Sequence, residues 1–199
     1  MILPIVVYGD PVLRKVGENI TKDYEGLEEL IGNMYETMYK AKGLGIAAPQ
    51  IGRAIRLFVL DLSPFAKDDD EDTEDYSPEQ KLQLKNFKKV FINARMISES
   101  GEEWKFNEGC LSIPKLNEDV IRKKEIEIEY YDEKFVKHRE KYDGVIARVI
   151  QHEYDHIDGK LFTDRLSPFK RKLIAGKLND IASGKTTADY KTKLYKARK

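Results

Sequence analysis

The segment QHEYDH at residues 151–156 contains the pattern H-E-x-x-H. Two histidines four positions apart share one face of a helix, so both imidazoles can bind one metal ion with Glu153 beside them. Apolar and histidine positions recur at helical spacing and predict a helix from about Gly144 through Ile157. These positions are Val145, Val149, His152 and His156. The alternative is a pair of core histidines whose ring nitrogens are satisfied by hydrogen bonds.

A third metal ligand has to come from elsewhere in the chain. The extended metzincin spacing requires a histidine where this sequence has Phe162, and Glu153 is the last glutamate, so no downstream glutamate can bind the ion. His138 lies in a charged stretch typical of a surface histidine. Cys110, the only cysteine, is the leading candidate, and a Cys/His/His set with one open position is typical of a catalytic site. A buried, inert Cys110 is the alternative.

Three segments together resemble one family, the peptide deformylases. They are GLGIAAPQ at 43–50, EGCLS at 108–112 and QHEYDH at 151–156, and they occur in the family's order. The resemblance runs from DPVLR at 10–14 to LFTDRLSP at 161–168. It weakens in an acidic insertion and in a basic tail.

The resemblance implies that Cys110, His152 and His156 bind one divalent metal ion, natively Fe2+ in many bacterial members, while Zn2+, Ni2+ or Co2+ also suit the ligands. Glu153 would act as general base and acid toward a metal-bound water. Gln50, through its side-chain amide, and Leu111, through its backbone N–H, would stabilise the oxyanion. The reaction implied is removal of the N-formyl group from the N-terminal methionine of newly synthesised polypeptides, with release of formate.

A small recess for the formyl group and an apolar pocket for the methionine side chain are expected around these residues. The residues expected to bind substrate are Leu44, Gly45, Ile46, Gly109, Val145, Arg148 and Val149. Arg148 stands where many members carry an apolar residue, so a more polar pocket rim is expected. Asn117 stands where some members carry an arginine.

The expected fold class is α+β, with mostly antiparallel sheets packed around a central metal-bearing helix and a C-terminal helix. The C-terminal helix should run from Ser167 or Pro168 to about Ala182, with Phe169, Leu173 and Leu178 on its apolar side. A further helix is predicted between Asp23 and Lys42, and the small residues of 43–52 predict a packed loop. Strands are predicted over 55–61, 90–93 and 126–130, the last with one wet face.

The chain of 199 residues is long enough for one catalytic domain, expected over 1–183 with an acidic surface insertion at about 62–86. Residues 184–199 are expected to form a flexible basic tail. The 35 basic and 35 acidic side chains cancel, which gives no reason to expect DNA or an anionic membrane as partner. One cysteine, no signal peptide and no long apolar stretch indicate a cytoplasmic protein.

Two other functions compete with the deformylase hypothesis. A zinc endopeptidase could use the same helix and ligands. The chain could instead be a ribosome- or RNA-binding module whose metal site is not catalytic. The basic C-terminal region supports this alternative, because it could contact ribosomal RNA. A plainly solvated tail is the alternative for that region.

Overall fold

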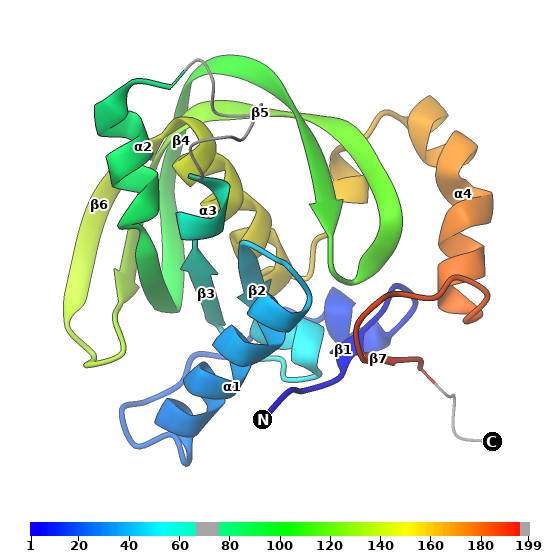
Figure 1. Ribbon diagram of the computed structural model, residues 1–199, viewed down its shortest axis with the longest axis horizontal. Helices are drawn as coiled ribbons and strands as arrows, with labels where there is room; N and C mark the ends of the chain where they lie inside the picture. Colours follow the sequence, from blue (N-terminus) through cyan, green and yellow to red (C-terminus); the bar gives the residue numbers. More distant parts are fainter. Residues whose placement is uncertain (67–75, 196–199) are drawn as a thin grey trace.

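The computed structural model describes residues 1–66 and 76–195 (Figure 1). Its helices are α1 (Leu27–Lys40), α2 (Pro78–Lys85), α3 (Gly144–Ile157) and α4 (Pro168–Ala182). Its strands are β1 (Ile5–Val6), β2 (Gly45–Ala47), β3 (Leu57–Asp61), β4 (Lys88–Cys110), β5 (Ile113–Tyr131), β6 (Lys137–Asp143) and β7 (Thr192–Lys193). Short 3-10 turns are η1 (Pro11–Arg14), η2 (Ala48–Ile51), η3 (Ser63–Phe65) and η5 (Phe162–Arg165). Over these described ranges, no helix has the length and apolar character needed to span a membrane.

The main sheet has five antiparallel strands in the order β2-β3-β4-β5-β6. Every residue of β3 is buried, because its side chains alternate between two apolar clusters on opposite faces of the sheet. Phe58 and Leu60 face α3, while Leu57 and Val59 face α1. The sheet is thus covered on both faces, and the expected combination of helices with antiparallel strands is confirmed.

The cluster on the α3 side of the sheet, here called the α3-side cluster, joins the buried face of α3 to the middle strands. Its members include Ala47, Phe58, Leu60, Leu62, Ala66, Leu84, Phe91, Ile128, Val145, Ile146 and Ile150. The α1-side cluster joins α1 to the opposite face of the sheet. Its members include Leu27, Leu30, Met34, Met38, Ile46, Leu57, Val59, Val90 and Ile92. α3 is thereby held against the sheet along its length.

The two longest strands, β4 and β5, were only partly predicted. Figure 1 shows them as a curved pair that reaches from the side of α2 and β6 to the side of α4. Their ladder contains four register shifts, and such bulges bend a strand pair. Charged side chains pair across the strands, as in Lys105 with Asp119 at 3.2 Å and Glu103 with Lys123 at 3.5 Å. These pairs replace the apolar alternation by which a strand is recognised in a sequence.

Helix α4 has the predicted bounds but a different buried face. Phe169 and Leu173 are 71% and 66% exposed, so the predicted apolar side is wrong for these two residues. Leu178 is buried as predicted, and Ile174 and Ile181 are buried with it against the first half of β5 and the N-terminal segment. The segment 43–52 is packed as predicted, but it contains β2 and η2 where a loop was expected.

The flanks of the acidic insertion are part of the folded body. Residues 67–75 lie outside the described residues. Leu62, Ala66 and Leu84 belong to the α3-side cluster, and α2 begins at a Ser77 cap. The region 62–86 therefore contributes core residues at both ends, which a purely solvated insertion would not.

The C-terminal segment also differs from the expected flexible tail. β7 pairs in parallel with β1, in the register Ile5 with Thr192 and Val6 with Lys193. The N–H of Ile5 donates to the carbonyl of Lys191 at 2.9 Å. Backbone pairing thus holds residues 191–193 on the body of the protein.

Candidate metal centre and groove

The two histidines of the H-E-x-x-H segment and Cys110 meet in space. α3 places the rings of His152 and His156 with their centroids 5.2 Å apart, and Cys110 ends β4 at the turn into β5. The Sγ atom of Cys110 lies 3.2 Å from Nε2 of His156. The three ligand atoms all lie within 4.8 Å of one another. Among the described residues this is the one group of its kind, and His138 is bound to Asp132 elsewhere.

The geometry of this group fits a metal ion. Ligand atoms around a tetrahedral ion with bonds of about 2.0–2.3 Å lie roughly 3.5 Å apart, close to the separations found here. Nδ1 of His152 donates to Oε2 of Glu108 at 2.9 Å, which leaves Nε2 as the free ligand nitrogen. Nδ1 of His156 is buried and has no hydrogen-bond partner in the described part of the chain.

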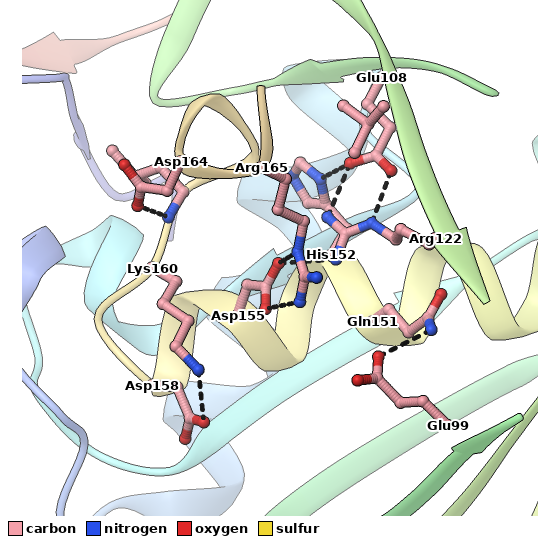
Figure 2. Close-up of polar contacts among 12 residues, drawn as sticks. Glu99, Glu108, Arg122, Gln151, His152, Asp155, Asp158, Lys160, Asp164 and Arg165 are labelled. Atoms are coloured by element: carbon pink, nitrogen blue, oxygen red, sulfur yellow. Dashed lines mark hydrogen bonds and ion pairs between the residues drawn. The ribbon is translucent and has the colours of Figure 1, made fainter. Parts of the chain in front are cut away.

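Behind the histidines lies a buried network of charged side chains (Figure 2). Arg122 donates two hydrogen bonds to the Glu108 carboxylate at 2.7 and 2.8 Å and one to Asp155 at 2.6 Å. Arg165 binds Asp155 from the other side through two bonds of 2.6 Å. Burial alone would raise the pKa of Glu108, but hydrogen bonds from Arg122 and His152 outweigh burial and hold that pKa well below its ordinary range. Glu108 therefore stays ionised and fixes the orientation of the His152 ring.

Glu153 has a different environment from Glu108. Its side chain is buried, and Oε2 has no hydrogen-bond partner within residues 1–66 and 76–195. Burial raises the pKa of Glu153 to about 7. A carboxyl group with such a pKa can both accept and return a proton near neutral pH.

Gln50 is oriented by both ends of its side-chain amide. Its Oε1 accepts a hydrogen bond from the N–H of Ala47 at 2.8 Å. Its Nε2 points toward Cys110 Sγ at 3.5 Å and Ser112 Oγ at 3.4 Å. The amide N–H2 group of Gln50 is therefore directed at the metal-ligand group.

Part of this site opens on a groove with a volume of about 540 Å³, while His156 lies behind the groove lining. Of the residues predicted to bind substrate, Leu44, Gly45, Gly109 and Val149 line the groove. Gln50, Leu111 and Glu153 line it as well, together with Cys110 and His152. Lys42, Lys115 and Asn117 also border it.

Two of the predicted pocket residues face away from the groove. Ile46 points into the α1-side cluster, because alternation along β2 sends its side chain to the face opposite Gly45. Val145 lies one turn before Val149 on α3, where the α3-side cluster covers it. Neither residue lines the groove.

Arg148 borders the groove, but the expectation that it makes the rim more polar is wrong. The residue is 1% exposed, and its guanidinium donates to Glu108 at 2.9 Å and to the carbonyl of Trp104 at 2.7 Å. Its Cζ lies 4.6 Å from the centroid of the Trp104 ring. The charge of Arg148 is therefore turned into the protein and away from the groove.

Sequence reasoning assigned no role to several residues around this site. Glu108 belongs to one of the recognised motifs. Its role was missed because its hydrogen bonds to Arg122 and His152 join positions far apart in the chain. Tyr190 also lines the groove, from a segment expected to be a flexible tail. The available signal for Tyr190 was an aromatic side chain in a mostly polar segment, a signal that Tyr195 shares.

Gly45 provides space for Glu153, and this can be tested. A Cβ atom at position 45 would lie 2.7 Å from Oε1 of Glu153 and 2.6 Å from Cδ2 of Leu60. We expect Gly45→Ala to displace the carboxylate and lower kcat/KM roughly 10- to 100-fold, because small misplacements of reacting groups are costly. Gly32→Ala on α1 is the matched control, since a Cβ there meets no atom within 4 Å. Equal activity of the two variants would contradict this role.

A buried carboxyl group beside a Cys/His/His set at a groove is the arrangement of a metal-dependent hydrolase. The family model for polypeptide deformylase matches residues 2–172. The chain therefore belongs to the peptide deformylase family, and it is a hydrolase that removes the N-formyl group from nascent formyl-methionyl polypeptides.

Similar proteins agree with this assignment over the whole chain. A peptide deformylase of Flavobacterium psychrophilum is 61% identical over 194 residues, covering 98% of this chain and 97% of that protein. One of Flavobacterium johnsoniae is 58% identical, covering 100% and 99%. The crystal structure of a peptide deformylase from Legionella pneumophila superposes with a TM-score of 0.75 at 34% identity, covering 93% of this chain and 98% of that one. This family membership replaces the endopeptidase and RNA-binding alternatives.

Proposed function

We propose that Cys110, His152 and His156 hold one divalent metal ion, natively Fe2+, in a groove that binds the formyl-methionyl end of a nascent chain. Zn2+, Ni2+ or Co2+ would also suit this donor set. The observation that carries the proposal is the closeness of the three ligand atoms, within 4.8 Å of one another, at the groove that Cys110, His152 and Glu153 line. When bound, the ion supplies Lewis acidity and a lowered pKa for water.

Glu153 would handle the proton of the reaction. Its free Oε2 would take a proton from the attacking water, and the same atom would return it to the amide nitrogen of the departing methionine. The near-neutral pKa of Glu153, caused by burial, suits both transfers. The products are formate and a free methionine amine.

Two donors would stabilise the negative charge that develops on the formyl oxygen. One is the Nε2 group of Gln50, which the bond from Ala47 to Oε1 orients toward the ligand group. The other is the backbone N–H of Leu111, next to Cys110 at the turn between β4 and β5. Preset donors of this kind lower the barrier because they need no reorientation during the reaction.

The substrate would lie along the groove walls formed by Leu44, Gly45, Gly109 and Val149. In this proposal the metal-bearing α3 is the element around which the antiparallel sheet packs, within a single catalytic domain that includes the C-terminal segment paired through β7. A cytoplasmic location and a ribosome contact through the basic C-terminal region stay predictions.

Metal removal tests the proposal directly. We expect protein purified without oxygen to contain about one metal ion per chain and to release formate from a formyl-Met tripeptide. A chelator should abolish formate release, since without the ion the groove keeps only weak hydrogen-bond donors. Fe2+, Zn2+, Ni2+ and Co2+ are then added back separately. The measurement is metal content together with formate produced. Unchanged activity of metal-free protein would contradict the metal site, and no activity with any ion would contradict the substrate.

A further inference from the structure

The segment that follows α4, residues 184–195, forms a strap across the body of the protein; we call it the C-terminal strap. The chain reverses at Gly184, which has φ of 78°, and a Cβ there would lie 2.5 Å from Leu194 Cδ1. Pairing of β7 with β1 then fixes the far end of the strap. Figure 1 shows the strap beside β1 and near the tip of the β4–β5 pair. The family match ends at residue 172, so the strap lies beyond it.

The strap reaches the groove at Ala188, Asp189 and Tyr190, all three of which line it. The hydroxyl of Tyr190 donates a hydrogen bond of 2.7 Å to the backbone carbonyl of Leu111. The Tyr190 ring and the Leu111 side chain both pack against the α1-side cluster. The strap therefore touches the residue that follows the cysteine ligand.

The turn that carries Leu111 is held from outside the β4–β5 ladder. Cys110 pairs with Ile113 across the turn, and the two residues between them make no ladder pair. The carbonyl of Leu111 is bound by Tyr190, and the carbonyl of Ser112 accepts from the N–H of Tyr8 at 2.8 Å. Both contacts come from the region where β1 and β7 pair. This two-stranded sheet therefore positions the turn.

We propose that Tyr190 is a positioning residue for deformylation: its hydroxyl fixes the Leu111 main chain, and its ring forms one wall of the substrate groove. This inference rests on the proposed role of the Leu111 N–H as an oxyanion donor. A displaced carbonyl at Leu111 rotates the adjacent peptide groups, and a donor aimed even slightly off the developing charge stabilises it less. The ring acts separately, because a groove wall contacts bound substrate and transition state alike.

Two substitutions at Tyr190 separate these effects. Tyr190→Phe removes only the hydroxyl, and we expect kcat and kcat/KM to fall together by about 10-fold while KM stays constant, the pattern of an interaction specific to the transition state. Tyr190→Ala also removes the ring, and we expect KM for a formyl-Met tripeptide to rise in addition by roughly 5-fold. Tyr195→Phe is the matched control, since Tyr195 lies on the same strap and is 51% exposed. It should have wild-type kinetics.

Steady-state formate release, metal content and thermal unfolding are measured for all four proteins. A role confined to holding the strap in place would lower the melting temperature of Tyr190→Phe and leave its kcat unchanged, and that outcome overturns the inference. Equal losses in Tyr190→Phe and Tyr195→Phe would also overturn it. Wild-type protein without activity on formyl-Met peptides would instead contradict the proposed function, so the two failures are distinguishable.

Discussion

Glu153→Gln is expected to lower kcat for formate release by about 10³-fold or more, the scale of loss when a general acid–base group is removed. Glutamine keeps the size of the side chain, but its amide cannot take up a proton at Oε2. Metal content should stay at the wild-type level, because the ligand group consists of Cys110, His152 and His156. Glu153→Ala should behave in the same way.

The stability of the Glu153→Gln variant gives a second readout. A buried carboxyl group without a hydrogen-bond partner for one oxygen is costly, so a neutral amide should leave the free energy of unfolding unchanged or raised. Glu29→Gln, an exposed position in the first turn of α1, is the control and should change neither activity nor stability. A Glu153→Gln variant with full activity would remove Glu153 from the mechanism.

The grouping of the metal ligands could be predicted from the sequence because local rules determine most of it. The helical spacing of His152 and His156 places both rings on one face of α3, and the structure confirms the helix over Gly144–Ile157. Elimination of other ligands left Cys110, which the structure brings to 3.2 Å from His156. A small set of candidate residues made this long-range contact predictable.

The direction of individual side chains was harder to predict. Ile46 lies in the same short segment as Leu44 and Gly45, yet alternation along β2 turns it to the other face of the sheet. A loop was expected there, and in a loop no periodic rule says which way each side chain points. Arg148 was expected on the rim because the sequence does not show its partner. Glu108, forty positions earlier, accepts a hydrogen bond from its guanidinium.

Strands with charged side chains on both sides were missed for a related reason. β6, KHREKYD, is an edge strand whose residues are exposed or half-buried, so it has no apolar alternation. Its stability comes from pairing with β5 and from ion pairs such as Arg139 with Glu127 at 2.7 Å. Such pairs join distant positions and depend on the register, which a single sequence does not contain.

The buried network behind the histidines should be sensitive to substitution, because its charges are held away from water. Arg122 has a fully buried side chain and bonds two buried carboxylates, Glu108 and Asp155. Arg122→Met would leave both with fewer cationic partners, although Arg148 and Arg165 still contact them. Removing one partner of a buried ion pair costs about 3–5 kcal/mol, because the remaining charge stays away from water. We expect a loss of this size in the free energy of unfolding, measured by urea titration.

The corresponding fall in melting temperature should be roughly 6–20 °C for a chain of this size. Arg95→Met is the matched control, because Arg95 is 70% exposed in its pair with Glu129 at 3.5 Å, and exposed pairs contribute about 0–1 kcal/mol. Metal affinity should also fall in Arg122→Met, since Glu108 would be less firmly held and it orients the His152 ligand. If Arg122→Met were as stable as Arg95→Met, the network would contribute little to the fold. If it unfolded more easily but kept wild-type metal affinity, Glu108 would orient His152 without help from Arg122.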